Sequence, residues 1–187
     1  MKKLILVCLY FFTMLDVQSQ QIDFYKEDLT FRISNDTFFV SGNYYLKSDS
    51  EINKQISLFY EVPTDSIYYY PVNSTYFYNI TTNEEIKNVK RTTSGMVFPI
   101  FQQVETTLFV SYQQKLKSNT AKYILRTTRY WRKPFEEATY KLIIPNELEV
   151  SKFTYVPDKT EIIGDKKIYY WSKKDFMPST DMEFEFK

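Results

Sequence analysis

The chain ends on the stretch D-M-E-F-E-F-K (residues 181–187), in which charged and apolar side chains alternate without a break. Successive side chains of an extended strand point to opposite faces, so a period of two is typical of a strand with one buried face. Met182, Phe184 and Phe186 are therefore expected to face a core. The residues predicted to face solvent are Asp181, Glu183, Glu185 and Lys187.

The same alternation recurs through most of the chain from residue 29 onward. Apolar side chains spaced by two occupy residues 29–33, 38–46, 56–60, 76–80, 108–116, 140–144 and 153–155. β-branched and aromatic residues dominate these runs, as they do in strands. Turn-forming pairs such as Asn35-Asp36 and Gly164-Asp165 separate them. The pattern predicts an all-β protein, an antiparallel β-sandwich of the Ig-like or jelly-roll-like kind.

Residues 82–90 are the one stretch with features of a helix. Thr82 and Glu85 have the spacing of a capping box, and Ile86 and Val89 would share a helical face. A hairpin turn at Asn83-Glu84 explains the same residues, and both interpretations stay open at this point.

The N-terminal residues have the organisation of a signal peptide. Lys2 and Lys3 precede an apolar run at residues 4–15, and Val17 and Ser19 are placed for signal peptidase. We expect cleavage after Ser19. A retained membrane anchor is the alternative, but a spanning helix needs roughly 20 apolar residues. The chain is therefore predicted to be exported without a stable membrane span.

Cysteine usage points to the compartment. Cys8 is the only cysteine and lies within the predicted leader, so the mature chain would have no disulfide. Domains secreted through the eukaryotic route usually carry disulfides, which favours a bacterial protein of the periplasm or cell surface. Residues 20–187 contain no linker-like segment and are predicted to form one β-sandwich domain, with a division near residue 99 as the alternative.

Composition argues against the commonest reaction centres. The chain contains no histidine, and its one cysteine lies in the leader, so serine or cysteine triads and zinc sites lose their usual residues. We expect no catalytic residue, no cofactor and no metal. The net charge is +1, and it falls to zero without Lys2, Lys3 and Asp16, so nucleic acid is not an expected partner.

Paired carboxylates keep a hydrolase open as an alternative. Glu183 and Glu185 would share one strand face, and residues 84–85 and 136–137 are adjacent glutamates. Glycosidases place two carboxylates on either side of the scissile bond. Solvated strand edges and turns account for the same glutamates.

Two aromatic runs, Tyr68-Tyr69-Tyr70 and Tyr76-Phe77-Tyr78, lie close together in the sequence. Adjacent strand residues point to opposite faces, so one set of rings is exposed unless another layer covers it. Tyrosine combines a large contact area with a hydroxyl, which suits a binding surface, although a core filled by tyrosine is the alternative. The candidate binding patch consists of Tyr68, Tyr69, Tyr70, Tyr76, Phe77 and Tyr78.

These features predict a non-catalytic exported binding or assembly module of the bacterial cell envelope, with a protein or glycan partner. A carbohydrate-binding module that uses the Tyr-rich segment is the first alternative, and a carboxylate-dependent hydrolase is the second. A binding surface made of exposed rings needs no reaction centre, which agrees with the composition.

Residues 108–156 also carry a resemblance to known proteins. They read L-F-V-S-Y at 108–112, then Y-I-L-R-T at 123–127, Trp131 and Pro134, and A-T-Y-K-L-I-I-P at 138–145. This order is similar to uncharacterised exported β-sandwich proteins of Gram-negative bacteria, and it resembles the N-terminal β-domain of zinc aminopeptidases. The peptidase zinc motif H-E-x-x-H is absent, so the resemblance implies a β-sandwich and no catalytic residue.

Overall fold

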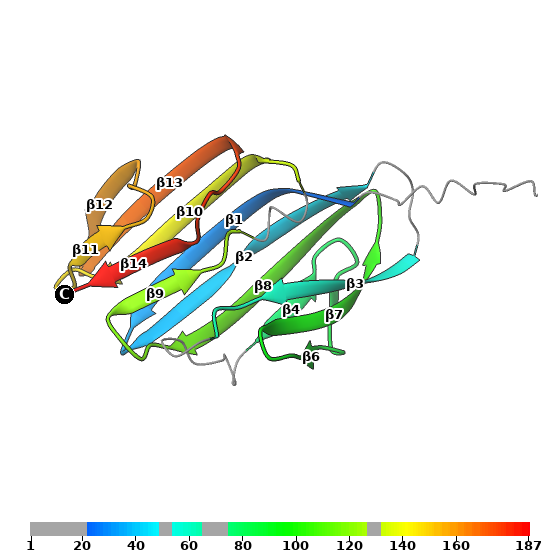
Figure 1. Cartoon of the computed structure of the whole chain (residues 1–187), viewed down its shortest axis with the longest axis horizontal. Helices are drawn as coiled ribbons and strands as arrows, with labels where there is room; N and C mark the ends of the chain where they lie inside the picture. Colours follow the sequence, from blue (N-terminus) through cyan, green and yellow to red (C-terminus); the bar gives the residue numbers. More distant parts are fainter. Residues whose placement is uncertain (1–21, 49–53, 65–74, 127–131) are drawn as a thin grey trace, which may run out of the picture.

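The computed structural model describes residues 22–48, 54–64, 75–126 and 132–187, and every regular element in these ranges is a strand (Figure 1). The all-β prediction is confirmed. Because the described ranges contain no helix, they offer no helical segment that is long and apolar enough to cross a membrane. The strands are β1 (Ile22–Ser34), β2 (Thr37–Ser48), β3 (Lys54–Glu61), β4 (Tyr76–Asn79), β5 (Glu84–Glu85), β6 (Lys90–Arg91), β7 (Gly95–Gln102), β8 (Glu105–Lys115), β9 (Thr120–Tyr123), β10 (Phe135–Pro145), β11 (Val150–Phe153), β12 (Lys159–Ile163), β13 (Lys166–Phe176) and β14 (Met182–Phe186).

The largest sheet has eight strands in the order β12-β13-β10-β1-β2-β8-β4-β5. All neighbours in it are antiparallel except β1 and β10, which run parallel with Phe31 opposite Leu142. The predicted antiparallel sandwich is confirmed, and this one parallel pair is an exception within it. Parallel neighbours need a long connection, and here most of the chain lies between the two strands.

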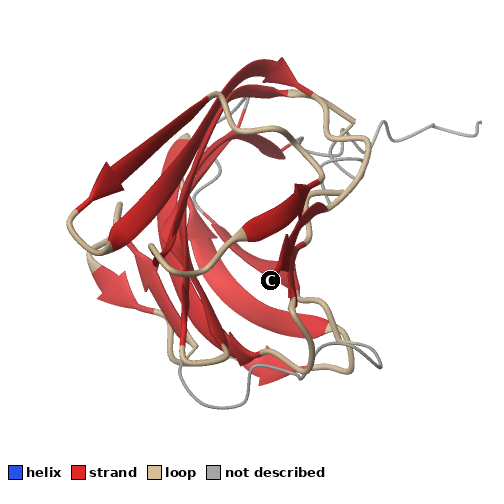
Figure 2. Cartoon of the chain, turned by 90° about the vertical axis from the view of Figure 1, so that its left-hand side faces the viewer, coloured by secondary structure: helices blue, strands red, loops and turns tan. Residues whose placement is uncertain are grey.

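Two three-stranded sheets, β11-β14-β9 and β3-β7-β6, pack against one face of the large sheet (Figures 1 and 2). We call this the core face. Phe31 on β1 contacts Phe184 on β14 at a ring-centroid distance of 5.7 Å, and Phe77 on β4 contacts Phe98 on β7 at 4.4 Å. The sandwich therefore has one long layer and a second layer made of two separate pieces.

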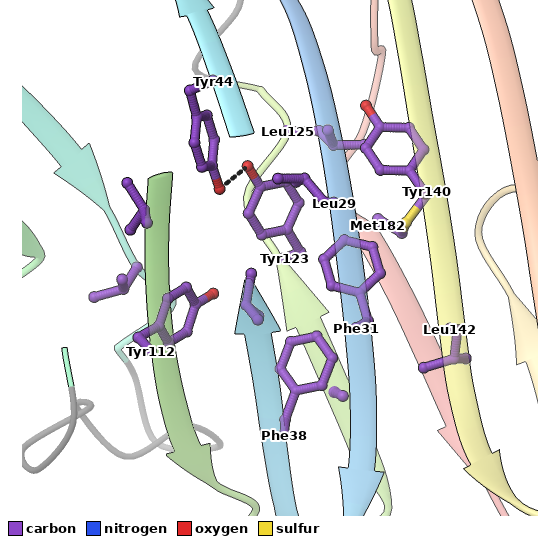
Figure 3. Close-up of a cluster of buried hydrophobic side chains, with 14 of the residues drawn as sticks. Leu29, Phe31, Phe38, Tyr44, Tyr112, Tyr123, Leu125, Tyr140, Leu142 and Met182 are labelled. Carbon is purple, nitrogen blue, oxygen red and sulfur yellow. Dashed lines mark hydrogen bonds between the residues drawn. The ribbon is translucent and has the colours of Figure 1, made fainter. Parts of the chain in front are cut away.

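The core between these layers is rich in aromatic rings, several of which appear in Figure 3. Met182, Phe184 and Phe186 are all buried, as the terminal alternation predicted. Asp181 does not face solvent as expected: it is 5% exposed, and its carboxylate accepts a hydrogen bond of 2.9 Å from the Arg126 guanidinium. An acidic side chain is buried in this way only where a cation or several donors stabilise its charge.

Residues 82–90 form no helix, so the hairpin interpretation is confirmed. The chain turns before β5 with Asn83 at a φ of 58°, and the Tyr78 hydroxyl donates to Asn83 Oδ1 at 2.8 Å. The Thr82 amide donates to Asn79 Oδ1 at 3.1 Å. Asparagine tolerates positive φ and competes for backbone amides, and both properties favour a turn over a helix.

Gly42 allows β1 and β2 to approach closely. A Cβ at this position would lie 2.1 Å from the Asp28 carbonyl oxygen and 2.7 Å from Leu29 Cα. Such distances are far inside van der Waals contact, so only glycine fits without a backbone shift.

The alternative domain division near residue 99 falls inside β7, where Pro99 lies opposite Ser57. The single-domain prediction stays a prediction.

Candidate functional site

The predicted aromatic patch is only partly on the surface. Tyr76 and Tyr78 lie on the outer face of the large sheet, because they pair with Ser111 and Phe109 of β8. Their rings stack at 6.0 Å with an interplanar angle of 19°, and Tyr76 is 41% exposed. The other predicted tyrosines, Tyr68, Tyr69 and Tyr70, lie outside the described residues.

Phe77 does not belong to any exposed patch. It lies opposite Val110, on the core face, and is 2% exposed against Phe98 and Tyr60. Among its described members, the candidate patch therefore loses Phe77 to the core and keeps Tyr76 and Tyr78. Where a strand carries rings on both faces, a period-two pattern does not indicate which face is buried.

Four of the six carboxylates that kept a hydrolase open are engaged in ion pairs, and the other two, Glu84 and Glu85, are exposed on β5. Glu183 contacts Lys122 at 3.0 Å, and Glu185 contacts Lys152 at 3.0 Å. Glu136 and Glu137 pair with Lys47 and Lys26 respectively. Among the described residues no group of three potential metal ligands comes together. These contacts agree with the interpretation of these glutamates as charges of solvated strands.

A cleft that the sequence did not indicate lies on the core side, where the second layer is divided. It has a volume of about 80 Å³ and opens beside Phe59, which is 51% exposed. Strands β3 and β9 form its sides, and β2 and β8 of the large sheet form its floor. Its lining residues are Phe24, Tyr44, Leu46, Leu58, Phe59, Tyr60, Glu61, Phe98, Leu108, Val110, Tyr123 and Ile124.

Three tyrosines of this lining form a chain of hydroxyl groups. Tyr60 and Tyr44 are joined by a hydrogen bond of 2.7 Å, and Tyr44 and Tyr123 by one of 3.1 Å; Figure 3 shows the second pair facing each other. The Tyr123 hydroxyl donates to Glu27 Oε2 at 3.2 Å, and Tyr140 donates to Glu27 Oε1. The chain therefore connects the cleft to one buried carboxyl group.

Glu27 is the charged centre of this network. It is 1% exposed, and among the described residues no lysine or arginine forms an ion pair with it. Burial raises the pKa of Glu27 to about 7, although the hydrogen bonds from Tyr140 and Tyr123 act in the opposite direction. Glu27 therefore changes its charge near neutral pH.

The tyrosines themselves remain protonated. Burial raises the pKa of Tyr44, Tyr123 and Tyr140 well above its ordinary value, and the nearby Glu27 carboxyl adds to this effect. Burial likewise raises the pKa of Tyr60, and Tyr44 contributes next. Each hydroxyl has a single proton to donate, so an ionised Glu27 orients the donors along the chain toward itself.

The rim of the cleft carries a second carboxyl group, Glu61. Burial raises its pKa and Asp181 adds to the effect, whereas Arg126 lowers it. Arg126 is already bound to Asp181, whose carboxylate also accepts hydrogen bonds of 3.2 Å from the Leu125 and Arg126 amides. This arginine is thus ion-paired with Asp181, which Lys122 also contacts at 3.7 Å.

Sequence reasoning missed Glu27, although a signal for it exists. Glu27 is in phase with Leu29, Phe31 and Ile33, the buried face of β1. The neighbouring Lys26 and Asp28 make the segment look solvated, and this concealed the pattern. A carboxyl group in phase with a buried strand face is a candidate for a perturbed functional group.

Comparisons with known proteins add information about the fold. No protein-family model matches the chain, and no curated protein matches it. Among solved structures, a candidate nutrient binding protein from Legionella pneumophila aligns with a TM-score of 0.66 and 12% identity, covering 89% of this chain and 67% of that one. These values describe similarity of fold alone.

M1 zinc metallopeptidases are a second group of structural neighbours. The enzyme from Deinococcus radiodurans aligns with a TM-score of 0.51 and 8% identity over 89% of this chain, and a two-domain variant bound to L-arginine has a TM-score of 0.54 and 8% identity. This chain spans 42% of either one. The resemblance to the peptidase β-domain is thus supported for the fold, without family evidence from sequence.

Proposed function

We propose that the chain is a non-catalytic binding module and that the cleft between β3 and β9 is its ligand site. The observation that carries the proposal is the lining, which combines apolar side chains with the hydroxyl chain of Tyr60, Tyr44 and Tyr123. Small-molecule sites are typically concave and mostly apolar, with a few polar groups that orient the ligand.

A binding role fits the chemistry of the polar groups better than a reaction does. The hydroxyls stay protonated, and Glu27 lies behind the wall with both carboxylate oxygens accepting hydrogen bonds from Tyr123 and Tyr140. A general base must reach the proton that it removes, and Glu27 is separated from the cleft by a tyrosine. These groups can select a ligand without transforming it.

The fold neighbour described as a candidate nutrient binding protein is compatible with this role. The leader features support a proposed location outside the cytoplasm, and the lack of cysteine beyond Cys8 favours the bacterial cell envelope. We therefore propose an exported module that captures a small organic molecule there.

A fragment screen by ligand-observed NMR tests the proposal. Fragments should bind the wild-type protein and lose binding in Leu58→Trp, because the indole would fill the cleft. Tyr76→Ala, on the outer face of the large sheet, is the matched control and should bind as the wild type does. If no fragment binds, or if a folded Leu58→Trp variant binds as the wild type does, the cleft is not the site.

A further inference from the structure

Aromatic rings supply half of the wall of the cleft. Six of its twelve lining residues are aromatic: Phe24, Tyr44, Phe59, Tyr60, Phe98 and Tyr123. The faces of such rings carry a partial negative charge and attract a cation within about 6 Å of the ring centre. Wherever a ring presents its face to the cleft, the wall is apolar and electron-rich at the same time.

The charged side chain of the described lining and the buried carboxyl group behind it are both acidic. Glu61 is the only charged side chain among the described lining residues, and Glu27 lies one hydrogen bond behind Tyr123. Arg126, which lowers the pKa of Glu61, is bound to Asp181 at 2.9 Å. On the described lining a carboxylate or phosphate ligand would meet an acidic group and no basic side chain, whereas a positive ligand would meet complementary charge.

The direction of the hydrogen bonds also favours a positively charged ligand. With Glu27 ionised, Tyr123 donates to the carboxylate, Tyr44 to Tyr123, and Tyr60 to Tyr44. Each hydroxyl has then used its only proton, so the oxygen atoms can offer a ligand only acceptor sites. The polar end of the wall attracts the positive side of a ligand.

We propose that the ligand of the cleft is an organic cation, namely a methylated ammonium group on a small apolar body; this inference rests on the cleft being the binding site. Methyl substituents suit a lining that includes Leu58 and Val110, because they reduce the hydration that a bare ammonium would lose. The cleft volume of about 80 Å³ suits a compact head group.

Isothermal titration with two isosteric probes tests the charge directly. Choline carries the cation, and 3,3-dimethyl-1-butanol has the same shape without it. Choline should bind at least about tenfold more tightly than the alcohol. Equal or tighter binding of the alcohol overturns the cation assignment and leaves the proposed binding function in place. Binding of neither probe also overturns it, while the fragment screen judges the cleft separately.

Charge-removing variants show whether the acidic groups are responsible. Glu27→Gln and Glu61→Gln should each weaken choline binding several-fold and leave the alcohol unchanged, because each removes one nearby negative charge. Glu137→Gln, whose carboxylate pairs with Lys26 on the outer face, is the matched control and should bind choline normally. If the control weakens binding as much, or if Glu61→Gln has no effect, local charge recognition is contradicted. If Glu27→Gln does not fold, Glu61→Gln alone tests whether local negative charge contributes to choline binding.

Discussion

At the scale of single residues, Glu27 couples stability to pH. Its pKa is about 7 in the folded state and about 4.5 in an unfolded chain. Between these values the folded protein binds a proton that the unfolded chain has lost, so stability decreases as the pH rises through this window. Above pH 7 the accumulated loss from this group is about 3 kcal/mol.

Glu27→Gln should remove most of this pH dependence, because the amide keeps the shape of the carboxyl group and has no charge to bury. Urea unfolding at pH 5 and pH 8 should show a fall for the wild type and a much smaller one for the variant. The chain contains no histidine, so no imidazole titrates in this window. Identical pH profiles for the two proteins would contradict the assignment, and Glu137→Gln serves as the reference.

Substitutions of Phe184 and its neighbour Glu183 test which face of β14 is buried. Phe184 is 1% exposed against Phe31 and Phe38, so Phe184→Ala should cost about 3–5 kcal/mol. Glu183→Ala loses only a surface contact with Lys122 and should cost less than about 1 kcal/mol. Denaturant midpoints measure both changes. Equal costs would mean that β14 is shifted by one residue.

At the scale of elements, the pair β1 and β2 depends on Gly42. Gly42→Ala places a methyl group against the Asp28 carbonyl, so the strands must separate, and we expect a loss of at least about 2 kcal/mol. Ser41→Ala, at the next position on the outer face, should stay within about 0.5 kcal/mol. Thermal unfolding compares the two variants. A tolerated Gly42→Ala would show that the close approach is not required.

Strand β4 carries what remains of the predicted aromatic patch on described residues. If the stacked pair Tyr76 and Tyr78 binds a glycan, Tyr76→Ala should abolish the signal on a glycan array with little change in melting temperature. Phe59→Ala, an exposed ring at the cleft, is the control that should retain it. Unchanged glycan binding in Tyr76→Ala would leave the outer face without a role in recognition.

At the scale of the whole molecule, export predicts the start of the mature chain. Intact mass of the protein recovered from the producing cell should place Gln20 first, because Ser19 precedes the predicted cleavage point. Edman sequencing gives the same answer independently. A recovered protein that still begins at Met1 would contradict the prediction.

The sequence predicted the layers better than the site. The alternation of side chains with a period of two identified the buried face in β8 and β14, where one face is more apolar than the other. It failed in β4, where rings lie on both faces, and for Asp181, whose burial depends on Arg126 in a distant segment. The cleft escaped prediction because its walls come from six strands that only the tertiary fold brings together. No local pattern encodes such a junction.

The parallel pairing of β1 with β10 has a consequence for how the chain reaches its final form. Lys26 meets Glu137, a separation of 111 residues, and β1 has β2 on its other edge. Contacts this distant in sequence form late and slow folding, because a long loop must close first. During synthesis, β1 therefore keeps one unpaired edge until β10 has emerged, and such an edge invites pairing with other chains. The earliest described strand to be made thus waits for a partner more than a hundred residues away, and the nascent protein stays prone to aggregation along this edge until β10 has emerged.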